Sequence, residues 1–286
     1  MKKVNLQKLL SEYFDSYQID QILQKITGFT KNQLFFCDKI ETVSDLEIKN
    51  IIELHKSWTP FEYIIQKAEF YGLDFYVDNR VLIPRNDTEI MVDIVLNSLK
   101  YNKKPGPVLM DIWTGSSCIP LSILENIDSK NIITHVVDIS TDALEVSKIN
   151  IHHHKKEVQQ HNWSLYSPLE DIDFSKNDVY ITANLPYIKD NDHDNMSAET
   201  IVHEPSLALY WWKDTGFELY EQLITQIIQQ IKKGFLKSVQ LYIEIWFDQK
   251  EYSENYLKNL NLDFQIHKDN SWIHRCIQIG FDSYLK

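Results

Sequence analysis

The stretch Asp178-Val-Tyr-Ile-Thr-Ala-Asn-Leu-Pro-Tyr-Ile188 joins a short apolar run to an abrupt polar end. Its residues 179–183 are mostly β-branched or aromatic and follow an acidic residue, which predicts a buried strand. Pro186 cannot donate to a sheet ladder and favours an extended Leu185, so we expect the strand to end here. Asn184 is therefore placed at the carboxyl end of a strand, where open α/β sheets bind their ligands.

Asn184 has the chemistry to hold an amino group. Its side-chain oxygen accepts hydrogen bonds, and the backbone carbonyl of Leu185 is a second acceptor beside it. A strand end with an Asn-initiated turn and no ligand accounts for the same residues. These residues alone leave both interpretations open, so the rest of the chain has to separate them.

The chain around this strand alternates between strand and helix patterns from residue 107 onward, which indicates an α/β fold with a parallel sheet. We expect further strands at 108–112, 132–138, 158–163 and 239–245, an edge hairpin at 264–267 and 275–279, and helices at 118–126, 140 to about 152 and 216–233. Acidic residues in 84–89 suit the start of another helix through residue 96.

Residues 1–70 show helical spacing of apolar side chains and carry no obvious chemistry. Such a module usually recognises a partner or covers a site, and a scaffolding role is equally plausible. Segments 70–77 and 80–83, separated by the polar pair Asp78-Asn79, predict a β-hairpin. The sequence therefore predicts a helical partner-recognition domain (1–70), a hairpin connector (71–84) and an α/β domain (85–286).

Composition limits the compartment and the partners. The 286 residues are 43% hydrophobic and 24% charged, with no apolar run long enough to span a bilayer and no signal peptide. The 3 cysteines lack metal-type spacing, which indicates a reducing cytoplasm. A net charge of −12 argues against a nucleic-acid substrate, since such proteins usually present a basic face. We do not expect His152-His153-His154 to bind metal, because adjacent helical residues point in different directions.

The first strand of the α/β region and its turn, residues 108–117, can offer backbone N–H groups to a ligand. The turn lacks both the lysine of a phosphate-binding loop and the spacing of the three-glycine dinucleotide motif. The second strand ends at Asp138, whose carboxylate can accept both hydroxyls of a ribose. Together with Asn184, this pattern fits S-adenosylmethionine (SAM) better than NAD, with Ser164 near the adenine.

With these motifs the chain resembles the HemK/PrmC family, the peptide chain release factor glutamine methyltransferases of bacteria. The resemblance runs from about Pro60 to the C-terminus. It is carried by residues 62–65, 67–73, 81–85, 88–89, 111–116, 137–140, 142–144, 184–188, 204–205, 208–209, 244–245 and 248–249. The motif 184–187 is shared with adenine and guanine exocyclic-amine methyltransferases, so 67–73 and 81–89 point to this family. A sister group acting on a ribosomal-protein glutamine matches less well around 83–85.

The resemblance implies a seven-stranded Rossmann-like SAM-dependent methyltransferase domain joined by the hairpin to a small helical domain. It places SAM against Trp113, Thr114, Gly115, Ser116, Ser117, Asp138, Ser164, Leu165 and Asn184. It places the substrate glutamine amide against Asn184 and the Leu185 carbonyl, in a slot shaped by Pro186 and Tyr187. The family has Asp where Ser164 stands. It also has Pro where Leu185 stands, so we expect a looser backbone there with the carbonyl retained.

The implied reaction is methyl transfer from SAM to the side-chain amide nitrogen of a glutamine in a peptide chain release factor, in the cytoplasm and without a metal. Two alternatives stay open. One is a methyltransferase acting on exocyclic amines of nucleic acids. The other is a non-catalytic relative that has lost SAM binding, because Trp113 stands where a small residue is expected.

Glycine and tryptophan have unusual frequencies. The chain has 7 glycines, where average usage of about 7% would give about 20, and it has 7 tryptophans. Set against the family pattern, each tryptophan stands where the family has, or tends to have, glycine. These positions are Trp58, Trp113, Trp163, Trp211, Trp212, Trp246 and Trp272. A gene that encodes glycine as UGA, translated with UGA read as tryptophan, explains all seven; divergence of the protein is the alternative.

Overall fold

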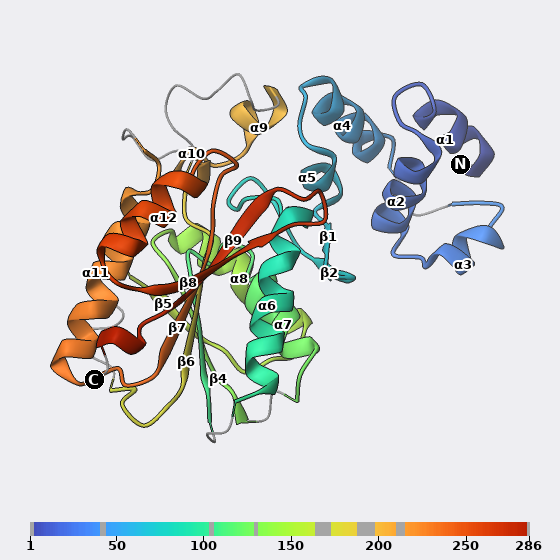
Figure 1. The fold of residues 1–286 in the computed structure, drawn as a ribbon. Coiled ribbons are helices and arrows are strands. Elements are labelled where there is room, and N and C mark those ends of the chain that lie inside the picture. Colours follow the sequence, from blue (N-terminus) through green and yellow to red (C-terminus); the bar gives the residue numbers. More distant parts are fainter. Residues whose placement is uncertain are drawn as a thin grey trace. The chain divides into compact units, whose positions relative to one another are not determined.

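The computed structural model describes residues 3–40, 44–102, 106–128, 131–163, 173–187, 198–209 and 215–284. The chain forms two compact units (Figure 1). One comprises Met1–Lys67 with Ser197–His203, and the other comprises Ala68–Met196 with Glu204–Lys286. No helix in the described ranges is both long and apolar enough to cross a membrane.

The first unit is helical, as its apolar spacing predicts. Its helices are α1 (Lys3–Leu10), α2 (Ser16–Thr27), α3 (Lys31–Phe35), α4 (Asp45–Lys56), α5 (Phe61–Ile65) and α9 (Ala198–His203). Leu10, Ile22 and Ile48 belong to the apolar cluster that joins α1 to α5. Ser44 caps α4, because its hydroxyl accepts the backbone N–H of Glu47.

The second unit contains a seven-stranded sheet, which confirms the predicted α/β class. Its strands are β3 (Val108–Ile112), β4 (Ile133–Asp138), β5 (Gln159–Asn162), β6 (Val179–Ala183), β7 (Val239–Glu244), β8 (Asp263–Lys268) and β9 (His274–Gly280). They are ordered β5-β4-β3-β6-β7-β9-β8. The first five in chain order pair in parallel, and β9 runs antiparallel to β7 and β8. The strand order reverses between β3 and β6, the point where such sheets bind ligands.

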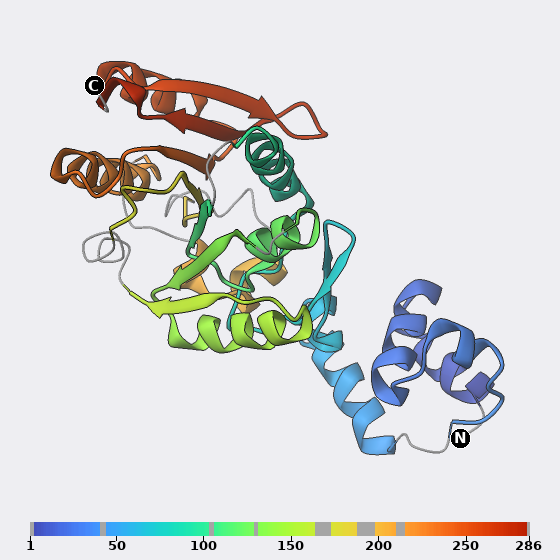
Figure 2. The ribbon, with the colours of Figure 1, turned by 90° about the horizontal axis from the view of Figure 1, so that it is seen from below.

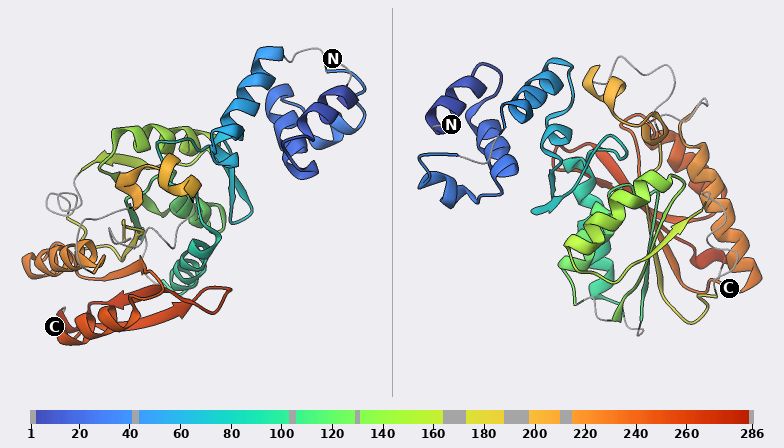
Figure 3. Two further views of the ribbon diagram at one scale, coloured as in Figure 1. Left: turned by 90° about the horizontal axis from the view of Figure 1, so that it is seen from above. Right: turned by 180° about the vertical axis from the view of Figure 1, so that it is seen from behind.

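Helices cover both faces of this sheet (Figures 2 and 3). The helices of the second unit are α6 (Glu89–Lys100), α7 (Cys118–Glu125), α8 (Thr141–His153), α10 (Ser206–Leu209), α11 (Glu218–Lys233) and α12 (Lys250–Asn259), with short 3-10 turns at Asn86–Thr88 and Asp282–Tyr284. Adjacent residues of a strand join different cores, since side chains alternate between faces. Met110 packs in the cluster that contains α11, whereas Leu109 packs with α6 and α7. The helix α12 was not predicted from the sequence.

The predicted hairpin with its turn at Asp78-Asn79 is wrong. The strands are β1 (Ala68–Phe70) and β2 (Leu73–Phe75), and Ala68 pairs with Phe75. The turn is Tyr71-Gly72, where both residues have positive φ angles (54° and 71°), as tight hairpin turns of this kind require. A polar pair was taken as the turn signal, although the glycine two residues after Phe70 met the conformational demand better.

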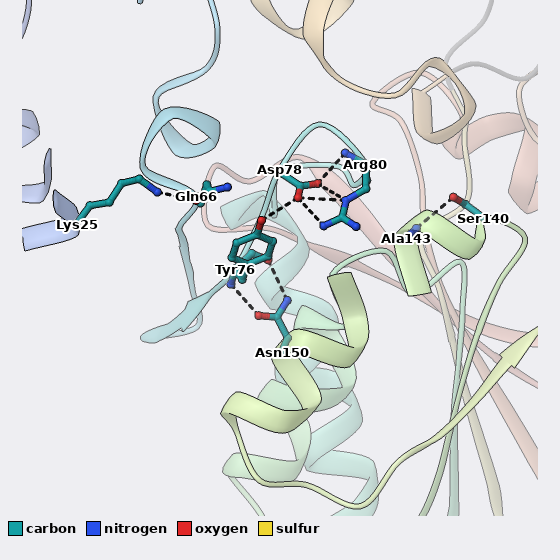
Figure 4. Close-up of polar contacts among 8 residues, drawn as sticks. All are labelled: Lys25, Gln66, Tyr76, Asp78, Arg80, Ser140, Ala143 and Asn150. Carbon is teal, nitrogen blue, oxygen red and sulfur yellow. Dashed lines mark hydrogen bonds and ion pairs between the residues drawn. The ribbon is translucent and has the colours of Figure 1, made fainter. Parts of the chain in front are cut away.

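Asp78 and Arg80 form hydrogen bonds and an ion pair with each other (Figure 4). The Asp78 carboxylate accepts the backbone N–H of Arg80 at 3.1 Å and pairs with its guanidinium at 2.6 Å. The Tyr76 hydroxyl donates to the same carboxylate at 3.0 Å. Asn150 on α8 holds the Tyr76 backbone in both directions, accepting its N–H at 2.7 Å and donating to its carbonyl at 3.0 Å. This network fixes the segment that leads from β2 towards α6.

Asp111 on β3 is buried in the sheet, with 1% of its surface exposed. The Thr182 hydroxyl donates to Asp111 Oδ1 at 2.6 Å, and burial raises the pKa of this carboxyl to about 7. An unfolded aspartate has a pKa near 3.9. Between about pH 4 and pH 7 the folded protein therefore keeps a proton on Asp111 that the unfolded chain releases, and this lowers the stability as the pH rises.

We predict that Asp111→Asn removes this dependence, because an amide cannot titrate. Urea unfolding at several pH values between 4.5 and 7.5 measures it, with the free energy of unfolding of the variant subtracted from that of the unchanged protein. This difference should fall by about 1.4 kcal/mol for each pH unit between the pKa of the unfolded aspartate and that of the folded Asp111. A difference that does not vary with pH would contradict a raised pKa at Asp111.

Candidate active site

The site begins where β3 leaves the sheet. The turn 113–117 between β3 and α7 has left-handed backbone at Trp113, Gly115 and Ser117, with φ of 60°, 52° and 63°. The Thr114 N–H donates to the carbonyl of Val137 at 3.1 Å, which ties the turn to β4. The buried Ser117 hydroxyl lies 2.6 Å from that of Ser147 on α8. These contacts hold the backbone N–H groups of the turn in a fixed loop at the carboxyl ends of the strands.

Asp138, at the end of β4, lies beside this turn. Its Oδ2 accepts the Gly115 N–H at 2.9 Å, and its Oδ1 accepts the Ser140 N–H at 2.9 Å. The side chain is buried, which raises the pKa of its carboxyl. Each carboxylate oxygen has a further lone pair, so Asp138 can brace the turn and still accept hydrogen bonds from a ligand.

The segment 184–187 is held from behind by buried aromatic residues. Leu185 donates its backbone N–H to the Tyr220 hydroxyl at 3.0 Å. A proline at this position would lack that N–H. The hydrogen bond therefore restrains the backbone that we expected leucine to loosen.

Tyr187 is held through its side chain. Its hydroxyl donates to Glu244 Oε1 at 2.7 Å, at the end of β7. Burial raises the pKa of both groups, with the neighbouring carboxylate adding to the rise at Tyr187, so the phenol keeps its proton and remains a donor. The Tyr187 side chain thus anchors the segment 184–187 to the end of β7.

Gly216 supports the same segment by a close approach of backbones. A Cβ at this position would lie 2.2 Å from the Tyr187 carbonyl oxygen, and its φ of 70° is left-handed. The Gln249 side chain donates to the carbonyl of Thr215 at 3.1 Å and lies 3.4 Å from that of Tyr187. Sequence reasoning gave no role to Gly216, Tyr220, Glu244 or Gln249. Two signals were available. The scarcity of glycine marks each retained glycine as a candidate for a backbone constraint, and Glu244 and Gln249 lie in stretches that carry the family resemblance.

A cavity of about 730 Å³, which includes space open to solvent, joins these elements. Of the predicted site residues it is lined by Trp113, Thr114, Gly115, Ser116, Asp138 and Asn184. Four others are not among the residues that line it: Ser117, Leu185, Pro186 and Tyr187. Ser164 and Leu165 lie outside the described residues.

Two further segments line the cavity that sequence reasoning had not placed there. They are 80–85, before α6, and 205–208, in and before α10. The buried Glu204 joins them, since its carboxylate accepts the Ile83 N–H at 3.2 Å and pairs with the Arg85 guanidinium at 2.5 Å. Two cations, Arg80 and Arg85, therefore stand beside the cavity, each already paired with a carboxylate.

The cavity combines a carboxylate at one strand end with a side-chain amide at another. The first can accept hydroxyl groups and the second can accept an N–H, so the arrangement suits a polar cofactor and an amide substrate side by side. The described ranges contain no group of three or more His, Cys, Asp or Glu residues arranged to hold a metal ion. His152, His153 and His154 form no such group.

Comparison with known proteins shows methyltransferase relatives. No protein-family model matches the chain. It is 34% identical over 224 residues to the release factor glutamine methyltransferase of Clostridium acetobutylicum, covering 77% of this chain and 74% of that protein. It is 32% identical over 263 residues to the bifunctional methyltransferase of Rickettsia bellii, covering 82% of this chain and 45% of that protein. The chain thus spans about half the length of such bifunctional relatives.

Solved structures share the fold. The crystal structure of the hMettl16 catalytic domain in complex with the MAT2A 3′UTR hairpin 6 superposes with a TM-score of 0.55 at 12% identity, covering 96% of this chain and 91% of that chain. At this level of identity the likeness concerns the fold alone.

We predict that Gly216→Ala destabilises the protein more than Gly234→Ala. Both glycines are left-handed, with φ of 70° and 82°, but a Cβ at Gly234 meets nothing within 4 Å. The free energy of unfolding should therefore fall by about 1–2 kcal/mol in the control Gly234→Ala, the cost of left-handed backbone alone. In Gly216→Ala it should fall by roughly twice that or more. Chemical denaturation measures both. Equal losses would contradict the close approach to Tyr187.

Proposed function

The chain belongs to the release factor glutamine methyltransferase family, and from this premise we propose that it transfers a methyl group from SAM to the side-chain amide nitrogen of a glutamine in a peptide chain release factor. The observation that carries the proposal is that Asn184 lines the same cavity as Asp138 and the turn 113–116. The side chains that we propose to bind the amide and the ribose thereby face one space. A cytoplasmic location, expected from the cysteines, is part of the same proposal.

The residues of the cavity fit SAM in type. Asp138 would take the ribose hydroxyls, and the N–H groups of the turn 113–117 would face the methionine part. Both assignments agree with the free lone pairs of the buried carboxylate and with the left-handed loop beside it. Bound there, SAM would supply an electrophilic methyl group on sulfur.

The chain's own task is to orient a poor nucleophile. The lone pair of an amide nitrogen is delocalised into its carbonyl, and two acceptors that hold the amide hydrogens favour a geometry in which the lone pair is directed at the methyl group. Asn184 Oδ1 and the Leu185 carbonyl are these acceptors in our proposal. The hydrogen bond from Leu185 to Tyr220 holds the same backbone in place. Catalysis is then mostly positioning, aided by electrostatics.

No general base is required before the methyl group moves. The positive charge that forms on nitrogen is lost when a proton leaves after the transfer. No histidine lines the cavity in the part of the chain that the structure describes.

The helical first unit is proposed to recognise the protein substrate. Phe35 and Phe36 on and after α3 are about four-fifths exposed, at 78% and 83%, and pack against each other at 5.2 Å between ring centroids. Adjacent exposed aromatic residues are typical of surfaces that bind proteins. This supports the partner-recognition role expected for residues 1–70.

A methylation assay with labelled SAM separates this proposal from its alternatives. A bacterial release factor and ribosomal RNA are offered in parallel, to the chain as given and to Trp113→Gly. Label in the release factor, on glutamine, supports the proposal. Label in RNA alone would reject it in favour of nucleic-acid methylation, which the net charge of −12 disfavours. Absence of SAM binding in both proteins would support a non-catalytic relative.

We predict that Asn184→Ala abolishes methyl transfer and leaves SAM affinity largely unchanged, because the amide is directed at the substrate. All proteins compared carry Trp113→Gly, so that the indole does not limit cofactor entry. Single-turnover transfer and calorimetric SAM titration measure the two effects separately. Turnover close to that of the parent would remove Asn184 from the mechanism.

We predict that Asp138→Ala weakens SAM binding through the loss of charge-assisted hydrogen bonds, each worth roughly 1.5–3 kcal/mol. Asp142→Ala, on the exposed first turn of α8, is the matched control and should leave affinity unchanged. Because Asp138 also braces the turn, melting temperatures must be measured alongside. Unchanged affinity in a folded Asp138→Ala protein would contradict the ribose assignment.

A further inference from the structure

We infer that positions 58, 113 and 272 are glycine in the protein made by its own organism, because its gene encodes glycine with UGA codons that are read here as tryptophan. One part of this inference, that the residue at 113 decides whether the cavity admits SAM, rests on the proposed function. The remainder rests on backbone conformation and composition alone.

The tryptophans share the backbone preference of the glycines. Six of the seven glycines have positive φ angles, Gly280 being the exception. Of the seven tryptophans, Trp211 and Trp212 lie outside the described residues, which leaves five. Three of these five, Trp58, Trp113 and Trp272, have φ of 62°, 60° and 65°. Left-handed backbone is uncommon for non-glycine residues and a marked outlier for bulky ones.

Other residue types adopt this conformation far less often here. Only five further non-glycine residues have positive φ in the described ranges, namely Gln66, Tyr71, Ser117, Lys155 and Asn261. They are drawn from more than two hundred residues, whereas the three tryptophans are drawn from five. Left-handed positions therefore gather specifically at tryptophan.

Trp58 stands at the end of α4 in the position that glycine usually occupies. The Trp58 N–H donates to the carbonyl of His55 at 3.0 Å, and the next N–H, of Thr59, donates to that of Leu54 at 3.1 Å. These two bonds define a Schellman motif with Trp58 at its left-handed residue. The indole is 69% exposed, so no packing compensates for the unfavourable backbone.

The same chain contains this motif with glycine. At the end of α11 the Gly234 N–H donates to the carbonyl of Ile231 at 2.9 Å, and the Phe235 N–H donates to that of Gln230 at 3.1 Å. Gly234 has φ of 82°. The ends of α4 and α11 thus make the same pair of bonds, and only the residue type at the left-handed position differs.

Trp272 stands at the corresponding place of a hairpin connection. It closes the loop 269–273 between β8 and β9, where its N–H donates to the Asp269 carbonyl at 3.0 Å and the Asp269 N–H donates to the Ile273 carbonyl at 2.9 Å. The last left-handed residue of such loops is typically glycine. The residue is 79% exposed, and the one ring contact recorded for it is that of the Lys268 ammonium, 5.5 Å from the ring centroid. A cation–π contact at an exposed site is worth about 0.5–1 kcal/mol, which is less than the cost of left-handed backbone, about 1–2 kcal/mol.

Trp113 stands in the cavity itself. It follows β3, lines the cavity, and packs against the core. Its indole Nε1 is buried and has no hydrogen-bond partner in the part of the chain that the structure describes. An unpaired buried donor is unfavourable, in addition to the left-handed backbone. Glycine at 113 would remove both penalties and vacate the space of an indole beside Gly115 and Asp138.

Composition extends the inference beyond these three positions. Reassigning all seven tryptophans would give 14 glycines, from 7 + 7, against about 20 expected from average usage. Trp163 and Trp246 are not left-handed, so conformation does not bear on them. A single decoding rule would nevertheless apply to every UGA codon in the gene.

The gene and the mass of the natural protein test the inference directly. We expect UGA codons at 58, 113 and 272, and peptides from the protein purified from its own organism with the mass of glycine at these positions. UGG codons there, or peptides with the mass of tryptophan, would overturn it. Neither result depends on whether the protein methylates anything.

Stability gives an independent test on purified protein. Trp58→Gly and Trp272→Gly should each raise the melting temperature, because glycine adopts left-handed backbone without a steric penalty. Tyr101→Gly is the matched control, since this tyrosine is 82% exposed but has an ordinary φ of −97°, and it should lower the melting temperature. A lowered melting temperature for both tryptophan variants would count against glycine at these sites.

The role of position 113 is tested by calorimetric titration with SAM. Trp113→Gly should bind SAM at least about tenfold more tightly than the protein with all seven tryptophans. Trp272→Gly should bind SAM with the same affinity as that protein. Equal affinity of Trp113→Gly and the unchanged chain would overturn the role of residue 113. If neither protein binds SAM although the gene carries UGA, the proposed cofactor fails and the codon assignment stands.

Discussion

A single row of register partners sets the level at which the sheet ends and the site begins. The row consists of Val137, Ile112, Ala183 and Ile243, on β4, β3, β6 and β7. The next residues along these strands are Asp138, Trp113, Asn184 and Glu244. Asp138 braces the turn after β3, and Trp113 is the first residue of that turn. Asn184 lines the cavity with its amide, and Glu244 accepts the hydrogen bond of the Tyr187 hydroxyl. A slip of one residue in any pairing would turn one of these side chains to the other face of the sheet. The positions of the polar groups therefore depend on an apolar row that does not itself line the cavity.

The segment after Asn184 shows how its geometry is maintained without the proline that the family resemblance led us to expect at 185. Proline would restrict the backbone internally, whereas Leu185 is restrained externally, through its N–H and the Tyr220 hydroxyl. Gly216 permits the loop before α11 to approach the Tyr187 carbonyl, and Glu244 fixes the Tyr187 ring. These supports come from three elements that follow the segment in the chain. The geometry of this segment is thus a tertiary property, supplied by residues remote in sequence.

The difference between local patterns and contacts between remote residues explains which features could be predicted from the sequence. The strands, Asp138 and Asn184 follow from local patterns, because a buried strand and the polar residue that ends it are adjacent in the sequence. Tyr220 and Glu204 could not be placed, since their partners Leu185 and Ile83 are 35 and 121 residues away. The hairpin turn was misplaced for another reason: a polar pair at 78–79 was weighed above the conformational demand that Gly72 satisfies. Ser164 and Leu165, the expected adenine contacts, lie outside the described residues.

The demand for positive φ also changes how position 113 should be understood. It is the residue at which β3 must leave the row and turn towards α7, so its left-handed backbone is imposed by the register of the sheet and the start of the helix. A side chain there is unfavourable for the backbone before any ligand is considered, and an indole adds a buried N–H without a partner. Trp58 and Trp272 meet the same backbone demand at a helix end and a hairpin, and neither lines the cavity that Trp113 lines. Adaptation to a lost ligand could account for a bulky residue at 113 but not for the other two. One cause that acts on the codon accounts for all three.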